Sequence, residues 1–335
     1  MTKLAIKLAL IFLMFAAGCG RDEPSGFTAD ADMIVVGAGP AGLAAALEAA
    51  AGGATVRIVE MNSVGGGHGA MAGGFALVGT PLQEKRGIVD SPELAYADWM
   101  AYGETNDPDW TRRYAERSRA DVYEWLTALG VEFRLIIPTP DASVPRFHFT
   151  QGTSINVVVP MMRAALHNPR IEFDFNHKAE SLIIDDGRIT GVQTRGQRTG
   201  HTQQLSARAI VLATGGFQGD LDRVRAAWGG AAPFPKRMLV GGSRFAVGSG
   251  HDLASDAGGV FAMLEKQVVF PNGVPDPRAP DRALIVRASG AIWVNGRVWF
   301  HGNVFDGILY DQPRTYGARK SLVKKMIKKH VQHDT

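Results

Sequence analysis

The chain contains a single cysteine, and this scarcity restricts its chemistry. Cys19 is the only thiol among 335 residues. The residues after it therefore carry no disulfide, no cysteine-ligated iron–sulfur cluster, no Cys-x-x-Cys-His haem site and no thiol nucleophile. Any redox reaction of this chain must use a bound organic cofactor.

Long hydrophobic runs are also scarce, and the clearest one lies near the N-terminus. Leu8–Phe15 is apolar but too short to cross a bilayer as a mature helix. Lys3 and Lys7 lie just before this run. After it, Ala16–Cys19 resembles the lipobox of bacterial lipoproteins. Basic, apolar and small residues in this order are typical of an export signal.

Residues 1–19 are therefore predicted to be a lipoprotein signal peptide in which Cys19 receives the lipid, and residues 20–30 a polar tether. A plain secretory signal and an uncleaved anchor are the alternatives. The favoured interpretation predicts an exported protein, attached to a bacterial membrane by its N-terminal lipid. It would lie at the periplasmic face or the cell surface.

Strong charge of one sign is absent outside the C-terminal end. The formal net charge is +3, but residues 313–335 hold seven of the 36 basic residues and one of the 33 acidic residues. The remaining 29 basic and 32 acidic residues indicate no surface for nucleic acid. Leu322, Met326 and Ile327 follow helical spacing, which suits an amphipathic helix on an anionic membrane or a solvated terminal helix. We favour the solvated helix.

The most informative pattern present is a strand, a glycine-rich turn, a helix and a second strand that ends on an acid. Met33–Val36 is a continuous apolar run, as in a parallel strand buried on both faces. Gly37 permits a tight turn, Gly39 lets a pyrophosphate approach the backbone, and Gly42 lets the helix pack closely. Glu60 is placed to bind ribose hydroxyls. The pattern predicts a site for the adenosine diphosphate half of a dinucleotide.

Three further glycine-rich motifs follow. Gly65–Gly74 is dense in glycine, which lets the backbone approach a flat or charged ligand. Ala213–Phe217 follows a second apolar strand, and Gly248–Asp252 is predicted to open a helix at Asp252.

The rest of the body alternates between helical and strand patterns. Two helices are expected within residues 92–130 and one at 157–166, with a loop at 147–153. Strands are expected at 171–175, 181–185, 189–194, 203–207 and, as a separate buried parallel strand, 209–213, with a hairpin turn at 185–188.

In this order, the motifs resemble the FAD-dependent oxidoreductases that include fumarate reductase flavoproteins, urocanate reductase and 3-ketosteroid dehydrogenases. The similarity covers roughly residues 30–300 and rests on four separate motifs in family order. It implies FAD as the cofactor, bound non-covalently, since His68 stands one position away from the histidine that carries flavin in some members. The implied FAD-binding residues are Gly37, Ala38, Gly39, Pro40, Ala41, Gly42, Glu60, Met61, Gly66, Gly67, His68, Ala72, Gly73, Gly74, Ala179, Ala213, Thr214, Gly215, Gly250 and Asp252.

The resemblance also implies a reaction, in which a carbon–carbon double bond next to an electron-withdrawing group is reduced or formed. Arg287 matches an arginine of the family motif, although Leu284 stands where the family has a glutamate. Arg287, His301 and His148 are the candidate catalytic residues, and a packed core histidine is the alternative for His148. The expected partners are a small-molecule substrate and a separate electron-transfer protein or quinone. No metal site is expected.

The predicted fold class is α/β. A Rossmann-like FAD-binding domain at 31–260, with a parallel sheet and a β-meander insertion, precedes a partial α+β substrate-capping domain at 261–312 and a basic tail at 313–335. The substrate would be a small organic acid, as in fumarate reductase, or a ketosteroid. The alternatives are a truncated, non-catalytic FAD- or ADP-binding lipoprotein and a gene fragment.

Overall fold

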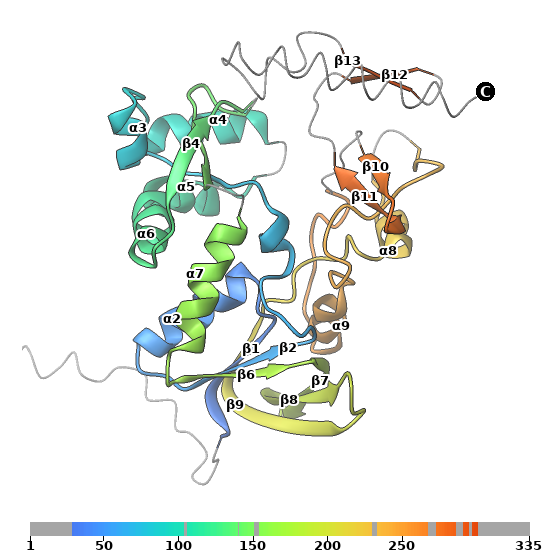
Figure 1. Ribbon diagram of the computed structural model, residues 1–335. Coiled ribbons are helices and arrows are strands. Elements are labelled where there is room, and N and C mark those ends of the chain that lie inside the picture. Colours follow the sequence, from blue (N-terminus) through green and yellow to red (C-terminus); the bar gives the residue numbers. More distant parts are fainter. Residues whose placement is uncertain are drawn as a thin grey trace, which may run out of the picture. The chain divides into compact units, whose positions relative to one another are not determined.

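The described part of the chain forms two compact units (Figure 1). The predictions for the signal peptide, Cys19, the tether up to residue 28, Arg287, His301 and the tail lie outside the described residues. This computed structural model describes residues 29–103, 106–139, 141–150, 154–229, 233–266, 273–285, 291–294 and 297–300.

The first unit lies within Met1–Gly216 and Gly248–Val260, and the second within Phe217–Val247 and Phe261–Thr335. The first unit is thus interrupted in sequence by part of the second.

A six-stranded sheet in the order β6-β2-β1-β9-β8-β7 is the centre of the first unit. Strands β6, β2, β1 and the end of β9 run parallel, while β8 and β7 add an antiparallel meander. The expected α/β fold with a parallel sheet and a β-meander is therefore confirmed. The strands are β1 Ala31–Val36, β2 Val56–Glu60, β6 Ile171–Phe175, β7 His177–Asp185, β8 Arg188–Gly196 and β9 Thr202–Leu212.

The two faces of this sheet carry separate cores. On one face, Val35 packs with Leu43 of α2 and Met161 of α7. On the other face, Ile34 packs with Leu253 of α9. Strand β1 is buried on both faces, as its continuous apolar run predicts. The helices are α2 Pro40–Ala51, α7 Ile155–Leu166 and α9 Ser249–Asp256.

A helical lobe is inserted between β2 and β6. Its three-stranded antiparallel sheet has the order β3-β5-β4. Helices α3, α4 and α5 each begin with a proline in the first turn and a capping side chain, from Thr80, Ser91 and Asp107. The elements are β3 Phe75–Ala76, α3 Pro81–Lys85, α4 Pro92–Tyr102, α5 Pro108–Arg117, the π-helix η2 Ser118–Glu124, α6 Trp125–Ala128, β4 Phe133–Ile137 and β5 Phe147–Thr150.

A buried arginine joins the parts of this lobe. The Arg146 side chain is fully buried and donates to Asp90 on the loop before α4 at 2.8 Å and to Asp98 on α4 at 2.6 Å. The Asp90 carboxylate also accepts from the Gln83 amide of α3 at 2.9 Å. Buried charges need such partners, because an unpaired ion in the interior is costly. The network ties α3 and α4 to the residue just before β5.

Two predictions of local structure were wrong. Residues 147–150 form strand β5 rather than a loop, because His148 and Thr150 are buried on alternate positions and the strand pairs on both sides. Residues 202–212 form one strand, which is antiparallel to β8 at its start and parallel to β1 at its end. Its last residues, including Val211, are half-buried rather than buried.

The second unit is built from short elements. A hairpin pairs β10 with β11, and Val240 bridges to Arg282 of that hairpin. A second hairpin pairs β12 with β13. The elements are α8 Leu221–Ala226, β10 Gly273–Asp276, β11 Ala279–Ile285, β12 Ala291–Val294 and β13 Arg297–Phe300.

Candidate nucleotide-binding site

Two glycines of the first motif are required by the fold itself. Gly37 follows β1 with φ +105°, and a Cβ placed there would lie 2.5 Å from the Ala213 carbonyl oxygen. A Cβ at Gly42 would lie 1.9 Å from the Gly37 carbonyl oxygen. Side chains at either position would separate β1 from its neighbour or from α2. These contacts explain the first and third glycines without any ligand.

Gly39 differs, because nothing in the protein fills the space beside it. A Cβ at Gly39 would meet no atom within 4 Å, and its φ of −74° is accessible to any residue. Gly39 is the N-cap of the twelve-residue helix α2, whose first turn contains no acid. The first N–H groups of a helix lack intrahelical partners and favour an anion. The open space at Gly39 therefore fits a diphosphate.

Glu60, at the end of β2, is tied into the glycine turn. Its side chain is buried, and one carboxylate oxygen accepts from the Ala38 N–H at 2.8 Å. The other oxygen accepts from the Asn62 N–H at 2.8 Å. A carboxylate has about four acceptor positions, so two remain for ribose hydroxyls. Glu60 thus orients the turn, in addition to its predicted contact with ribose.

The residues after β2 belong to a polar cluster that sequence reasoning missed. The Ser63 hydroxyl donates to Asn176 Oδ1 at 2.9 Å and accepts from Arg198 at 3.0 Å. Asn176 has φ +60°, and its N–H donates to the Asn62 carbonyl at 3.0 Å. Asparagine tolerates this left-handed conformation better than most residues, which is the one sequence signal at this position. Nearby in sequence, Met61 is half-buried and Ala179 is buried in the second core.

The second glycine motif is held against the first. The Gly66 N–H donates to the Ala38 carbonyl at 2.7 Å, and Gly66 and Gly67 both have positive φ. A Cβ at Gly69 would lie 2.2 Å from Pro40 Cγ. At the far end, a Cβ at Gly74 would lie 1.9 Å from the His148 carbonyl oxygen. Within this segment Gly67–Met71 is a short 3-10 helix, His68 is exposed, and Ala72 and Gly73 are half-buried.

The third and fourth motifs meet at the same place. The Ala213 N–H donates to the Val36 carbonyl at 2.8 Å, which sets residues 213–215 beside the first turn. A Cβ at Gly250 would lie 1.9 Å from Thr214 Oγ1, so α9 approaches this segment closely. Gly215, with φ +75°, has open space around it. Helix α9 begins at Ser249, three residues earlier than predicted, and Asp252 lies in its first turn.

The structure therefore brings together the four glycine motifs at the carboxyl ends of β1, β2 and β9. Ligands of open α/β sheets bind at this edge. Among the described residues, no group of histidine, cysteine or acidic side chains is arranged to hold a metal ion. None of the helices among them is both long and apolar enough to span a membrane.

The candidate catalytic residues are not assembled in the described part of the chain. His148 is fully buried in β5, where Nδ1 donates to the Arg146 carbonyl and Nε2 accepts from the Thr80 hydroxyl, each at 2.7 Å. Both ring nitrogens are thus used inside the lobe, as expected of a packed core histidine. Burial lowers the pKa of His148 to about 4, so its ring is neutral at pH 7. Arg287 and His301 lie outside the described residues.

Comparisons with known proteins agree with this geometry. A family model described as "FAD binding domain" matches residues 32–334. A KsdD-like steroid dehydrogenase of Mycobacterium tuberculosis is 30% identical, with 84% of this chain and 56% of that protein covered. A fumarate reductase (cytochrome) of Shewanella frigidimarina is 32% identical, with 79% of this chain and 46% of that protein covered.

A solved structure has the same fold. The 3-ketosteroid-delta4-(5alpha)-dehydrogenase of Rhodococcus jostii RHA1, in complex with 4-androstene-3,17-dione, superposes with a TM-score of 0.62 at 27% identity. The match covers 72% of this chain and 57% of that one. The chain thus spans about half the length of the relatives it matches.

The burial of His148 predicts a pH-dependent stability. Its pKa of about 4 lies below the ordinary 6.5, so the unfolded chain takes up a proton first as the pH falls. The stabilisation of the folded state that comes from the neutral His148 is therefore complete above about pH 6.5. It is lost as the pH falls toward 4, and the free energy of unfolding decreases by at most about 3 kcal/mol. Urea unfolding of the His148→Gln variant should show a flatter pH dependence over this range than the parent protein. The exposed His201→Gln variant should keep the parent slope, and an unchanged slope in His148→Gln would contradict the assignment.

Proposed function

Because this chain belongs to the FAD binding domain family, we propose that it forms the cofactor-binding part of a flavin-dependent oxidoreductase. The reaction would reduce or form a carbon–carbon double bond next to an electron-withdrawing group. The substrate would be a small organic acid or a ketosteroid, as the names of the fumarate reductase and steroid dehydrogenase relatives suggest. This class of reaction is favoured over a non-catalytic binding protein, since the matched relatives carry the names of enzymes.

The observation that carries the proposal is the convergence of four glycine motifs at one edge of the sheet. The N-terminus of α2 and the open space at Gly39 would hold the diphosphate. Glu60 would accept hydrogen bonds from the ribose while it keeps the turn in place through Ala38. Residues 66–74 and the space beside Gly215 would border the rest of the cofactor. When bound, FAD supplies hydride transfer at its flavin ring.

Substrate binding is assigned to residues outside the described part of the chain. Arg287 would bind a carboxylate or carbonyl oxygen, since arginine presents a planar pair of donors to such groups. His301 is proposed beside it. His148 is a positioning residue in this scheme: its carbonyl contacts Gly74 at the end of the second glycine motif, while its ring stays within the lobe.

The electron partner would be a separate protein or a quinone. The single cysteine of these 335 residues leaves no place in them for a cysteine-ligated redox centre. The word cytochrome in the name of the Shewanella frigidimarina relative supports a haem protein as one such partner. The same proposal includes export and attachment to a bacterial membrane through the lipid on Cys19.

Substitution of two neighbouring glycines should separate cofactor binding from folding. Gly39→Ala places a methyl group in open space, so the fold should persist while FAD affinity falls on the order of tenfold or more. Gly42→Ala forces a Cβ to within 1.9 Å of the Gly37 carbonyl oxygen, and such overpacking should cost roughly 1–3 kcal/mol of stability. Urea unfolding and FAD titration by flavin fluorescence measure the two effects. Full FAD affinity in a folded Gly39→Ala protein would refute the diphosphate site.

Turnover should be measured on the purified chain after loading with FAD. Oxidation of a reduced dye by fumarate, urocanate or 4-androstene-3,17-dione should depend on both FAD and substrate. An artificial acceptor tests the reverse direction with succinate and a saturated ketosteroid. Tight FAD binding without turnover of any of these compounds would overturn the proposed enzyme activity and leave the cofactor site in place.

The proposed lipid anchor has a direct test in a bacterial host. Metabolic labelling with palmitate should mark the full chain and place it in the membrane fraction. The Cys19→Ser variant should carry no label, because the proposed acceptor sulfur is absent. An unlabelled parent chain would rule the anchor out without affecting the assignment of the FAD site.

A further inference from the structure

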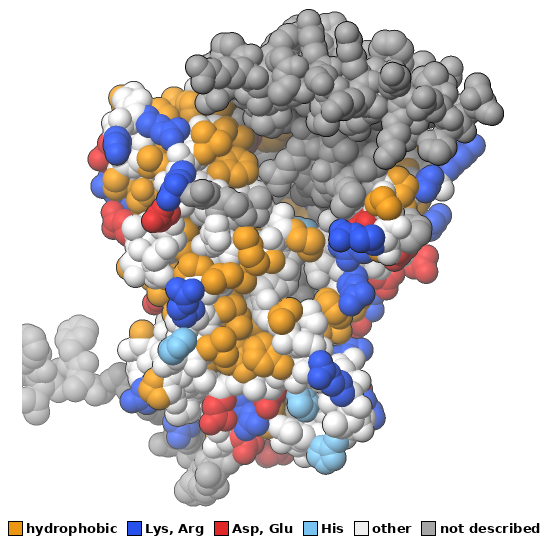
Figure 2. All heavy atoms as spheres, in the orientation of Figure 1, with side chains coloured by type: hydrophobic (Ala, Val, Ile, Leu, Met, Phe, Trp, Pro, Cys, Tyr) orange, Lys and Arg blue, Asp and Glu red, His pale blue; other side chains and the backbone are white. Residues whose placement is uncertain are grey.

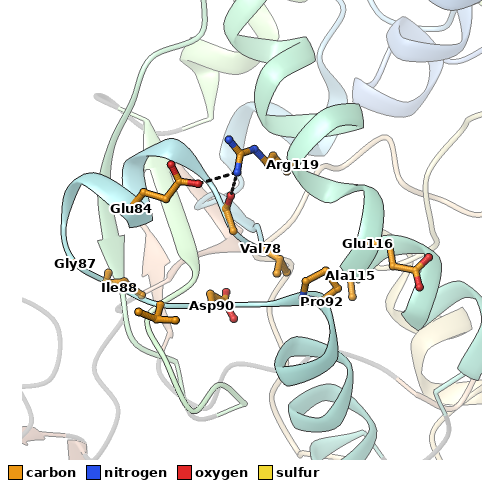
Figure 3. A pocket seen from close by; sticks show the side chains of 11 residues that line it. Val78, Glu84, Gly87, Ile88, Asp90, Pro92, Ala115, Glu116 and Arg119 are labelled. Carbon is orange, nitrogen blue, oxygen red and sulfur yellow. Dashed lines mark hydrogen bonds and ion pairs between the residues drawn. The ribbon is translucent and has the colours of Figure 1, made fainter.

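A surface pocket of about 430 Å³ lies in the helical lobe (Figure 3). Its wall comes from the link between β3 and α3, from α3 and the loop that leads into the first residue of α4, and from the neighbouring turns of α5 and η2. All of these belong to the first unit. None of the pocket-lining residues is among those predicted to bind FAD or substrate.

The floor of the pocket is apolar. Val78 and Ala115 are almost completely buried beneath it, at 3% and 2% exposure. Pro92 and Ile88 extend this surface; in Figure 3, Glu84 lies above the Ile88 end of this row and Glu116 beyond its Ala115 end, with Asp90 between Ile88 and Pro92. A ligand here would therefore meet hydrocarbon below and carboxylates at its edge.

The charge balance of the pocket is negative. Arg119 is its one lining cation, and its guanidinium is already shared: it donates to the Gly79 carbonyl at 2.7 Å, to Glu84 at 2.8 Å and to Glu124 at 3.0 Å. The buried Asp90 is neutralised by Arg146. Within the described part of the chain, the Glu116 side chain has neither a hydrogen bond nor an ion pair. One carboxylate of the pocket is thus available to a cation.

We propose that this pocket binds an alkyl cation, that is, a protonated amine or guanidinium on a short hydrocarbon stem. The stem would cover Val78 and Ala115, while the charged end would pair with Glu116. Long basic side chains behave in this way, with the stem on apolar surface and the charge toward water. An anion is disfavoured, since Arg119 is already paired with Glu84 and Glu124, and Glu116 adds another carboxylate to the pocket wall.

Two sources share this chemistry: a free alkylamine and a lysine or arginine side chain of a partner protein. Val89 at the rim is 86% exposed, which leaves the pocket accessible to a protein surface. The pocket is separate from the glycine motifs, so cation binding there is independent of the proposed oxidoreductase function.

A titration of the isotope-labelled full chain, followed by NMR of backbone amides, tests the proposal. Butylammonium should shift the amides of Gly79, Gly87 and Glu116. Butanol lacks the charge, and ammonium lacks the stem; ammonium should bind at least about tenfold more weakly, because several methylene groups are no longer buried. Glu116→Gln should weaken butylammonium binding about two- to fivefold, as expected for a partly exposed ion pair.

Asp109→Asn is the matched control, since it removes the same charge from α5 at a position outside the pocket. It should leave the affinity unchanged. N-acetyl-lysine amide separates the two sources: affinity equal to that of butylammonium indicates access for a protein side chain, and weaker affinity indicates a free amine. Equal binding of butanol and butylammonium, or equal effects of Glu116→Gln and Asp109→Asn, would overturn the proposal.

Discussion

The close backbone contact at the end of β1 is the constraint on which the rest of the site depends. The Gly37 N–H donates to the Val59 carbonyl at 2.8 Å, and the Ala213 N–H donates to the Val36 carbonyl at the same distance. Three strands are thereby joined where the chain turns into α2. Only a residue without Cβ leaves room for the Ala213 carbonyl beside Gly37. The edge where a ligand of an α/β sheet binds is thus set by main-chain packing.

Side chains then connect this contact to the surrounding segments. The Glu60 carboxylate accepts a hydrogen bond from the Ala38 amide, and the Ala38 carbonyl accepts one from the Gly66 amide. The segment that follows Gly66 ends at Gly74, which lies directly against the His148 carbonyl. The neighbouring Arg146 is held by the buried Asp90 carboxylate and the half-buried Asp98 carboxylate. The arrangement around the predicted cofactor therefore extends into the core of the helical lobe.

Figure 2 shows an apolar region on the surface of the first unit, over the area of α7.

Spacing in the sequence was a good guide where local geometry decides the outcome. The strand, turn and helix from Ala31 to Ala51 follow from an apolar run, three glycines and an alanine-rich stretch. The hairpin at Asp186 and Gly187, both with positive φ, follows from residues that accept that conformation. His148 shows the limit of such reasoning. A histidine between two phenylalanines suits a site or a core equally well, and only its contacts with Thr80 and the Arg146 carbonyl distinguish them.

By itself, the sequence determined the parallel β1–α2–β2 unit, the dinucleotide type of ligand and the order of the glycine motifs. These depend on short-range rules of turn geometry and strand patterning. The tertiary structure decided which residues fulfil a second role. In the structure, Glu60 accepts a hydrogen bond from the Ala38 amide, and residues 202–212 form one strand. Gly39 has open space beside it, whereas Gly37 and Gly42 are closely packed. Each of these features depends on contacts between residues distant in the chain, which a local sequence pattern cannot specify.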